Sequence, residues 1–510
     1  MKYFGRTPLE KVVCIGYALM MVLILGVCLF GNNIDYSEKT QILFAEPLLL
    51  CCGILIIGGL AVGLNWLFRH IPKNEKAEER ILLFLSILLL IFQAYCVWNY
   101  YFMTGWDASV IMKAAEAVAH GKNLEDFQYY FSTYPNNLLI VWLYGILIRF
   151  FDLVRVDYRI GILFFQCVLS WGTGLLLFDT ARQITNSRFA AWLSWILYLI
   201  LVGVSPWVSI PYSDSTGLIF PVAIFWCYVK MKKEESNKKW LYGGAIGLLT
   251  AIGYRIKPQI SIVLIAIGIV YVIHALKDLK QTVKTFGSIL ISLIIAMLLV
   301  STCIRSTHIK IDTDRTYGIT HFLMMGMNYY EGGGNGTWNA DDVGFSGSFS
   351  TAQERRKANL QVAGERVKEM GVPGMLHLMR RKILTNYNDG TFCWAGEGDF
   401  FIELLSKADS PFSEFLRTIY YIENRDRPGY QWFNNFERMI WLTILFAGIF
   451  SVMQKENRSW ISVVMLAVIG LTVFELLFEP RARYLYTYIP LYILLAVTGI
   501  QKIIRRKQIK

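Results

Sequence analysis

Residues 81–107 have the sequence ILLFLSILLLIFQAYCVWNYYFMTGWD, and this stretch decides the fold class. Its apolar part, residues 81–102, is long enough to cross the hydrocarbon core of a bilayer as a helix. Asp107 follows just after the end of that span. A carboxylate at the mouth of an apolar span is unfavourable unless it is solvated or paired, so Asp107 is a candidate functional residue. The alternative is that Asp107 caps a short helix over residues 108–120.

The composition of the whole chain indicates a polytopic membrane protein. The chain has 510 residues, of which 55% are hydrophobic and 17% are charged, and this balance is too apolar for a soluble protein of that size. A net charge of +12 would suggest nucleic acid as the partner of a soluble protein. Here many of the cations lie in short loops between apolar segments, where they set the topology, so we expect no nucleic-acid partner.

Twelve apolar segments are expected to span the membrane, although several are only about fifteen residues long. They fall near residues 11–30, 43–68, 81–102, 158–180, 189–206, 216–230, 240–254, 259–275, 285–304, 437–454, 459–478 and 484–501. The basic loops share one side if both termini are cytoplasmic, as the positive-inside rule requires. Residues 136–150 are also apolar, but a crossing there would invert every later loop. We therefore expect a re-entrant or interfacial helix at this place.

This topology predicts an all-α membrane protein with four parts. They are two additional N-terminal membrane helices (1–70), a central membrane module (71–304) with a first exofacial loop (103–157), a large exofacial loop or small subdomain (305–436), and C-terminal membrane helices with a basic cytoplasmic tail (437–510). The large loop contains a Gly-rich acidic stretch at 331–342 and a charged segment at 351–370, which we expect to be a solvated helix.

Four cations stand beside apolar spans on the expected exofacial side. They are Arg255, Lys257, Arg481 and Arg483. A bare cation there is unfavourable, and an anionic ligand would neutralise it. Arginine in particular offers a bidentate fork to phosphate, so these residues are candidate phosphate ligands. The alternatives are that they reach the lipid headgroups or pair with Glu475 and Glu479.

Two carboxylates, Asp107 and Asp214, are expected on the same side as these cations. Such a pair can supply a general base and a group that orients an acceptor or holds a divalent cation. Asp214 could equally cap a span in its Ser-Asp-Ser-Thr turn. The six histidines are scattered and form no metal-ligand motif, which leaves Mg²⁺ or Mn²⁺ on carboxylates as the metal that the sequence allows.

The order of these motifs resembles the GT-C superfamily of integral membrane glycosyltransferases, which includes the protein O-mannosyltransferases and the aminoarabinose transferases. The resemblance runs from about residue 82 to the C-terminus. It rests on the acid after a span (Asp107), the Tyr134-Pro135 turn that opens a second helix, the acid after the next helix pair (Asp214), and the late motif Glu479-Pro-Arg-Ala-Arg-Tyr.

The resemblance implies a sugar donor linked to polyprenyl phosphate, undecaprenyl phosphate in a bacterium, and an exofacial glycan, lipid or protein acceptor. It implies that Asp107 is the catalytic base, that Asp214 corresponds to the second acid of the family, and that Arg481 or Arg483 contacts the lipid phosphate. Tyr134 would help to orient the acceptor. Two further residues, Tyr212 and Glu479, are expected to support the site.

Two features leave the acceptor open. The protein mannosyltransferases carry Asp-Glu where this chain has Asp107-Ala108, and no soluble binding domain is appended. A lipid or polysaccharide transporter or flippase component is the alternative class of function. It would be expected to show paired half-repeats with broken helices, and the two halves of this chain share no similarity.

Overall fold

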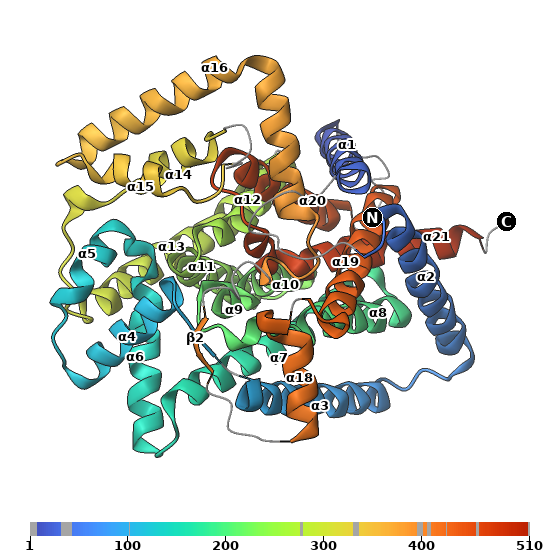
Figure 1. Cartoon of the computed structure of the whole chain (residues 1–510). Coiled ribbons are helices and arrows are strands. Elements are labelled where there is room, and N and C mark those ends of the chain that lie inside the picture. The colour runs from blue at the N-terminus through green and yellow to red at the C-terminus, as the bar shows by residue number, and fades with distance from the viewer. Residues whose placement is uncertain are drawn as a thin grey trace.

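A computed structural model describes residues 8–31, 43–100, 102–275, 279–329, 336–394, 401–404, 410–424, 426–454 and 458–507. These residues are almost entirely helical (Figure 1), which confirms the all-α prediction. Within them, the one sheet consists of two short antiparallel strands, β1 (Phe102–Thr104) and β2 (Phe401–Leu404). The strand pair joins the chain just after α3 to the large loop.

The helices of the first half of the chain are α1 (Pro8–Phe30), α2 (Glu46–His70), α3 (Glu75–Tyr100), α4 (Asp107–His120), α5 (Glu125–Thr133), α6 (Leu138–Leu153), α7 (Tyr158–Thr185), α8 (Arg188–Tyr198), α9 (Ser213–Gly217), α10 (Ile219–Lys233) and α11 (Lys239–Ile256). The second half contains α12 (Ile262–Ala275), α13 (Leu279–Arg305), α14 (Gly318–Gly326), α15 (Ala340–Gly347), α16 (Ala352–Tyr387), α18 (Pro411–Tyr420), α19 (Pro428–Ile449), α20 (Arg458–Leu477) and α21 (Ile489–Lys507).

Nine helical segments in the described part of the chain are long and apolar enough to cross a membrane. They are Pro8–Phe30, Glu46–His70, Glu75–Asn99, Pro135–Leu153, Tyr158–Thr185, Val283–Arg305, Pro428–Met453, Ser459–Leu477 and Ala482–Arg505. Two shorter apolar helices, Arg188–Gly203 and Pro258–Val272, accompany them. The segment expected to be re-entrant therefore has the length of a span, and its re-entrance stays a prediction.

Small residues allow a close contact between α11 and α13. A Cβ atom added at Gly247 would overlap the carbonyl oxygen of Ile289. The Ser292 hydroxyl donates to the carbonyl oxygen of Gly244 at 2.6 Å, across the same contact. Small residues at this spacing let two backbones approach, which is a common way for membrane helices to associate. The contact fixes α11, whose C-terminal end carries Lys257.

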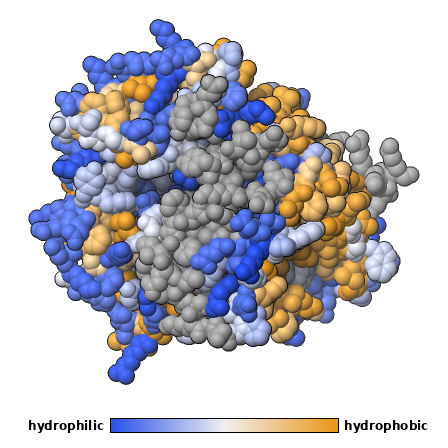
Figure 2. Space-filling view, viewed as in Figure 1, coloured by the Kyte–Doolittle hydropathy of each residue, from blue (hydrophilic) through white to orange (hydrophobic). Residues whose placement is uncertain are grey.

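The large loop forms a layer at one end of the bundle, where α14 and α15 lie beneath α16 in the upper left of Figure 1. Figure 2 shows hydrophilic side chains over this layer and hydrophobic ones over α1 and α2 on the right. The predicted charged helix is the first part of α16, and Thr351 caps it by accepting from the Glu354 amide at 3.2 Å. Residues 331–335 of the Gly-rich stretch lie outside the described residues.

Two features of α16 differ from the simple solvated helix that the sequence predicts. The helix kinks at Gly371, whose φ of 56° lies in the left-handed region that glycine adopts without strain. Beyond the kink it enters the bundle, and residues 382–394 are all buried. The loop layer is thus continuous with the core of the membrane module. In addition, α19 begins at Pro428, inside the expected loop.

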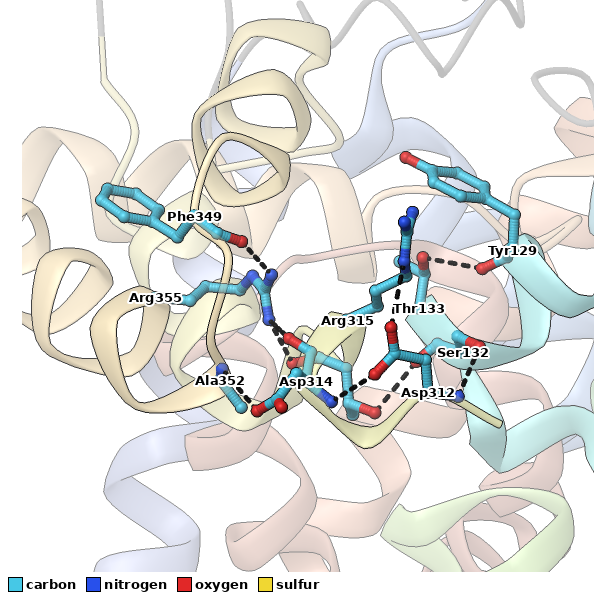
Figure 3. A network of polar contacts seen from close by, with 10 residues as sticks. Tyr129, Ser132, Thr133, Asp312, Asp314, Arg315, Phe349, Ala352 and Arg355 are labelled. Atoms are coloured by element: carbon cyan, nitrogen blue, oxygen red, sulfur yellow. Dashed lines mark hydrogen bonds and ion pairs between the residues drawn. The ribbon is translucent and has the colours of Figure 1, made fainter. Parts of the chain in front are cut away.

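Arg355 organises the loop layer from a buried position (Figure 3). Its guanidinium donates four hydrogen bonds to backbone carbonyl groups, at 2.6–3.1 Å. The acceptors are the carbonyl oxygens of Asp314, Thr316, Ser346 and Phe349. An arginine with five donors in a fixed plane suits such a set of carbonyls. It ties α15 and the start of α16 to the segment that enters α14.

The same segment is attached to α5. The Asp312 amide donates to the Ser132 hydroxyl at 2.9 Å, and the Thr316 hydroxyl donates to the Ser132 carbonyl oxygen at 2.9 Å. Ser132 lies just before the Tyr134-Pro135 turn. The loop layer is therefore bonded to the loop of residues 103–157, beside the candidate site.

Replacing Arg355 by Met should loosen the loop layer without unfolding the bundle. Four carbonyl groups would lose a charged donor, and we expect local opening of residues 313–351 to become easier by about 3 kcal/mol, or roughly 100-fold in hydrogen-exchange protection. The control is Arg356→Met, since Arg356 is the exposed neighbour. Equal protection in both variants would contradict this role of Arg355.

Candidate active site

A cavity of about 650 Å³ lies between the membrane module and the loop layer. Its wall comes from the start of α4, the turn after α5, the segments that flank α9 and α11, helix α14, and the chain that leaves α20. Seven of the site residues predicted from the sequence line it together: Asp107, Tyr134, Tyr212, Lys257, Glu479, Arg481 and Arg483. They come from parts of the chain that are far apart in sequence.

The most buried part of the site is an ion cluster centred on Asp214, in α9. One of its oxygens accepts from the Lys257 ammonium, and the other accepts from Arg483 Nη1 at 3.0 Å. The Asp214 side chain is 0% exposed, and those of Lys257 and Arg483 are 6% and 10% exposed. Asp214 is not part of the cavity wall. Both of its oxygens accept from cations, so Asp214 holds these two cations in place, and its role toward an acceptor or a metal stays a prediction.

Aromatic rings fix the Arg483 guanidinium further. Its central carbon lies 4.8 Å from the ring centre of Trp106 and 5.2 Å from those of Tyr212 and Tyr484. Cation–π contacts of this kind suit a planar guanidinium better than an ammonium. The cluster of Asp214, Lys257 and Arg483 has two positive charges and one negative charge. Both cations line the cavity wall.

Asp107 is the first residue of α4, and the helix is capped by Trp106 without a side-chain bond. The carboxylate of Asp107 therefore does not cap the helix, so the capping alternative is wrong. Its Oδ2 instead accepts a hydrogen bond from the Tyr212 hydroxyl at 3.0 Å. A negative charge in the first turn also interacts favourably with the helix dipole. The carboxylate is held in the cavity wall and is only partly buried.

Tyr130 is a neighbour of Asp107 that sequence reasoning missed. Burial raises the pKa of its phenol, and the Asp107 carboxylate raises it further. The phenol accepts from Asn137 Nδ2 at 3.0 Å, so its own proton is available to the carboxylate. Tyr130 lies one helical turn before Tyr134, and this spacing is the signal that could have identified it.

The late motif contributes two more charges to the wall. Arg481 Nε lies 3.7 Å from Glu479 Oε1, so Glu479 faces Arg481. Arg483, for which the sequence allows a pair with Glu479, donates to Asp214. Arg255 lies in the last turn of α11 and does not line the cavity, and its role as a phosphate ligand stays a prediction.

A buried lysine that the sequence did not single out supports this motif from α16. Lys382 Nζ donates to the carbonyl oxygens of Leu476 and Phe478 at 2.9 and 2.8 Å, and so caps the end of α20. Burial lowers its pKa to about 7, while the carboxylates of Glu475 and Glu479 oppose this shift. The turn into the late motif is therefore anchored to the loop layer's own helix.

The site does not provide a set of metal ligands. Among the described residues, no group of three or more His, Cys, Asp or Glu side chains gathers at one place. In the cavity wall, Asp107 is bonded to a phenol and Glu479 faces Arg481. The described residues therefore gather no set of carboxylates for Mg²⁺ or Mn²⁺, and no step of the chemistry below uses a metal.

Comparisons with known proteins identify a family. A family model described as a conserved hypothetical integral membrane protein matches residues 9–504, nearly the whole chain. No curated protein matches the sequence. The family match agrees with the apolar helices described above and covers both the membrane module and the loop layer.

The ion cluster should depend on Asp214 for its stability. Asp214→Asn removes the carboxylate that pairs with two buried cations, and we expect it to lower the free energy of unfolding by roughly 3–5 kcal/mol. Adding Lys257→Met to this variant removes one of the two cations and should recover part of the loss. The measurement is the midpoint of thermal aggregation in detergent. Asp152→Asn serves as the control, because Asp152 is 42% exposed. No difference between the two single variants would contradict the cluster.

Proposed function

From the premise that this chain belongs to a family of conserved hypothetical integral membrane proteins, we propose that it is a membrane glycosyltransferase of the GT-C type. It moves a sugar from a polyprenyl phosphate to a hydroxyl group of an exofacial acceptor. The observation that supports this best is that one cavity combines a positioned carboxylate, Asp107, with the buried cations Lys257 and Arg483.

The cations suit the leaving group of this reaction. As the bond between C1 of the sugar and the phosphate oxygen breaks, the electron pair goes to the phosphate, which gains negative charge. Lys257 and Arg483 are held in place by Asp214 before a ligand arrives, and Arg481 stands beside them. Preorganised charges in a site that excludes water stabilise a developing charge more than mobile ones do.

Asp107 suits the other half of the reaction. The acceptor hydroxyl attacks C1 from the side opposite to the phosphate, and its proton passes to the Asp107 carboxylate as the new C–O bond forms. The sugar is therefore transferred with inversion at C1. The hydrogen bond from the Tyr212 hydroxyl to Oδ2 fixes the position of the carboxylate.

The rest of the wall suits a lipid-linked donor. Apolar and aromatic side chains occupy much of the cavity wall, among them Tyr254, Ile256, Ile319, Phe474 and Phe478. Ile319 is 64% exposed and Tyr254 is 42% exposed. Apolar surface beside a phosphate-binding cluster is what a polyprenyl phosphate needs. A transporter of the same lipid would use the cations but would have no use for a positioned base.

We place both termini in the cytoplasm and the cavity on the exofacial side, because this arrangement satisfies the positive-inside rule. It puts the loop between α10 and α11 inside and α15 outside. The arrangement also makes the acceptor a component of the cell envelope.

Labelling of single cysteines tests this orientation. In a background where Cys51, Cys52 and Cys303, which are not buried, are replaced by Ser, Gly344→Cys should react with an impermeant thiol reagent in sealed cells. Asn237→Cys should react only after lysis. Both positions are exposed, so access to the reagent depends on sidedness alone. The reverse pattern would mean that residues 135–153 cross the membrane and that the cavity faces the cytoplasm.

Asp107→Asn tests the catalytic role. The amide keeps the size of the side chain and loses its basicity, so transfer should fall at least about 100-fold while the protein stays folded. The measurement is the release of undecaprenyl phosphate from undecaprenyl-phosphate sugars by the protein in native membranes. The matched control is Asp126→Asn, an exposed acid of α5. Normal turnover in Asp107→Asn would rule out Asp107 as the base.

A further inference from the structure

His321 of α14 lines the cavity, and the chemistry proposed above does not use it. Its side chain is 0% exposed. The imidazole lies between two aromatic rings, with its ring centre 4.5 Å from that of Tyr317 and 5.2 Å from that of Phe322. It is therefore held in one orientation by the loop layer.

The hydrogen bonds around His321 decide which ring nitrogen carries the proton. Nδ1 lies 2.7 Å from the hydroxyl oxygen of Ser346. That hydroxyl donates its own proton to Asn359 Oδ1 at 3.1 Å, so its oxygen is left to accept from Nδ1–H. In a neutral imidazole with the proton on Nδ1, the other nitrogen, Nε2, has a free lone pair. Nε2 is buried and has no hydrogen-bond partner.

His321 stays neutral at physiological pH. Burial lowers its pKa to about 4, which outweighs the opposing effect of the Asp342 carboxylate. Arg355, from α16, adds to the lowering. The ring therefore presents a neutral acceptor of hydrogen bonds rather than a positive charge.

We infer that Nε2 of His321 accepts a hydrogen bond from a sugar hydroxyl bound in the cavity. The inference rests on the proposed function and adds sugar recognition to it. A buried acceptor without a partner is unfavourable, and a ligand hydroxyl would satisfy it. A phosphate oxygen would be repelled by the lone pair, and a cationic ligand would be repelled by Lys257, Arg481 and Arg483, so a neutral hydroxyl is the class of group that fits. Helix α14 then recognises the sugar, and the cations opposite bind the phosphate.

Two substitutions of His321 distinguish the role of Nδ1 from the role of Nε2. Asn places an amide where Nδ1 lies, so His321→Asn can keep the bond to Ser346 while it loses Nε2. Gln reaches as far as Nε2, so His321→Gln can keep the outer acceptor while it loses the bond to Ser346. A role in packing alone would affect both variants in the same way.

The experiment compares the binding of undecaprenyl phosphate and undecaprenyl-phosphate glucose to the protein in nanodiscs. The wild type should bind the glucose-bearing lipid more tightly, by about tenfold, because one extra hydrogen bond is made. His321→Asn should lose this preference and keep its affinity for the bare lipid, and His321→Gln should retain most of the preference. Arg483→Lys should weaken the binding of both lipids.

The hydroxyl could instead belong to a sugar of the acceptor. In that case, the preference between the two lipids stays the same in His321→Asn, and the acceptor concentration for half-maximal transfer in native membranes rises about tenfold. If His321→Asn changes neither quantity, the assignment of Nε2 is overturned while the proposed function stands. If the wild type binds neither lipid, the proposed function falls and this inference falls with it.

Discussion

The buried carboxylate of Asp214 is the constraint on which the rest of the site depends. It holds one cation from the end of α11 and another from the start of the last apolar segment. Removing such charges from water is unfavourable, and the bonds among them must compensate for it. An arrangement of this kind is stable only when three elements meet in one register. The ion cluster therefore orders the helices and, at the same time, prepares a positive wall for a ligand.

The loop layer supports the same wall of the cavity. Lys382 reaches from α16 to cap α20 just before the late motif. Arg355 bonds to the segment that enters α14, and that segment is bonded to Ser132 of α5. The loop layer is thus more than a cover, because its side chains position both the late motif and the helix that carries His321. The short pairing of β1 with β2 joins this layer to the segment just before Asp107. The loop layer therefore contacts both the segment that carries Asp107 and the segment that carries the late motif.

Much of this architecture follows from the sequence. The apolar spans and the distribution of lysine and arginine among the loops predict which charged motifs share one side of the bilayer. Only those motifs are then candidates for a common site. For this reason, Asp107, Lys257 and Arg483 could be assigned to one site without a structure. The all-α fold follows from the same apolar spans, because a membrane leaves the backbone few alternatives.

Other features could not be predicted, because they depend on which way a helix face turns. Arg255 and Lys257 are two residues apart, yet only Lys257 faces the cavity. Asp214 pairs with two cations from distant elements, a contact that the sequence did not reveal. Neither His321 nor Lys382 belongs to a recognisable motif, and each becomes informative only when its neighbours from distant helices are known.

The account requires a lipid phosphate to bind against the ion cluster, within reach of the carboxylate of Asp107. An electron cryomicroscopy map of the protein with undecaprenyl phosphate in nanodiscs measures this directly. We expect the phosphate density to contact Arg483 and Lys257, with the lipid chain along the apolar wall near Phe474 and Phe478. Phosphate density elsewhere, with the cavity free of lipid, would contradict the account.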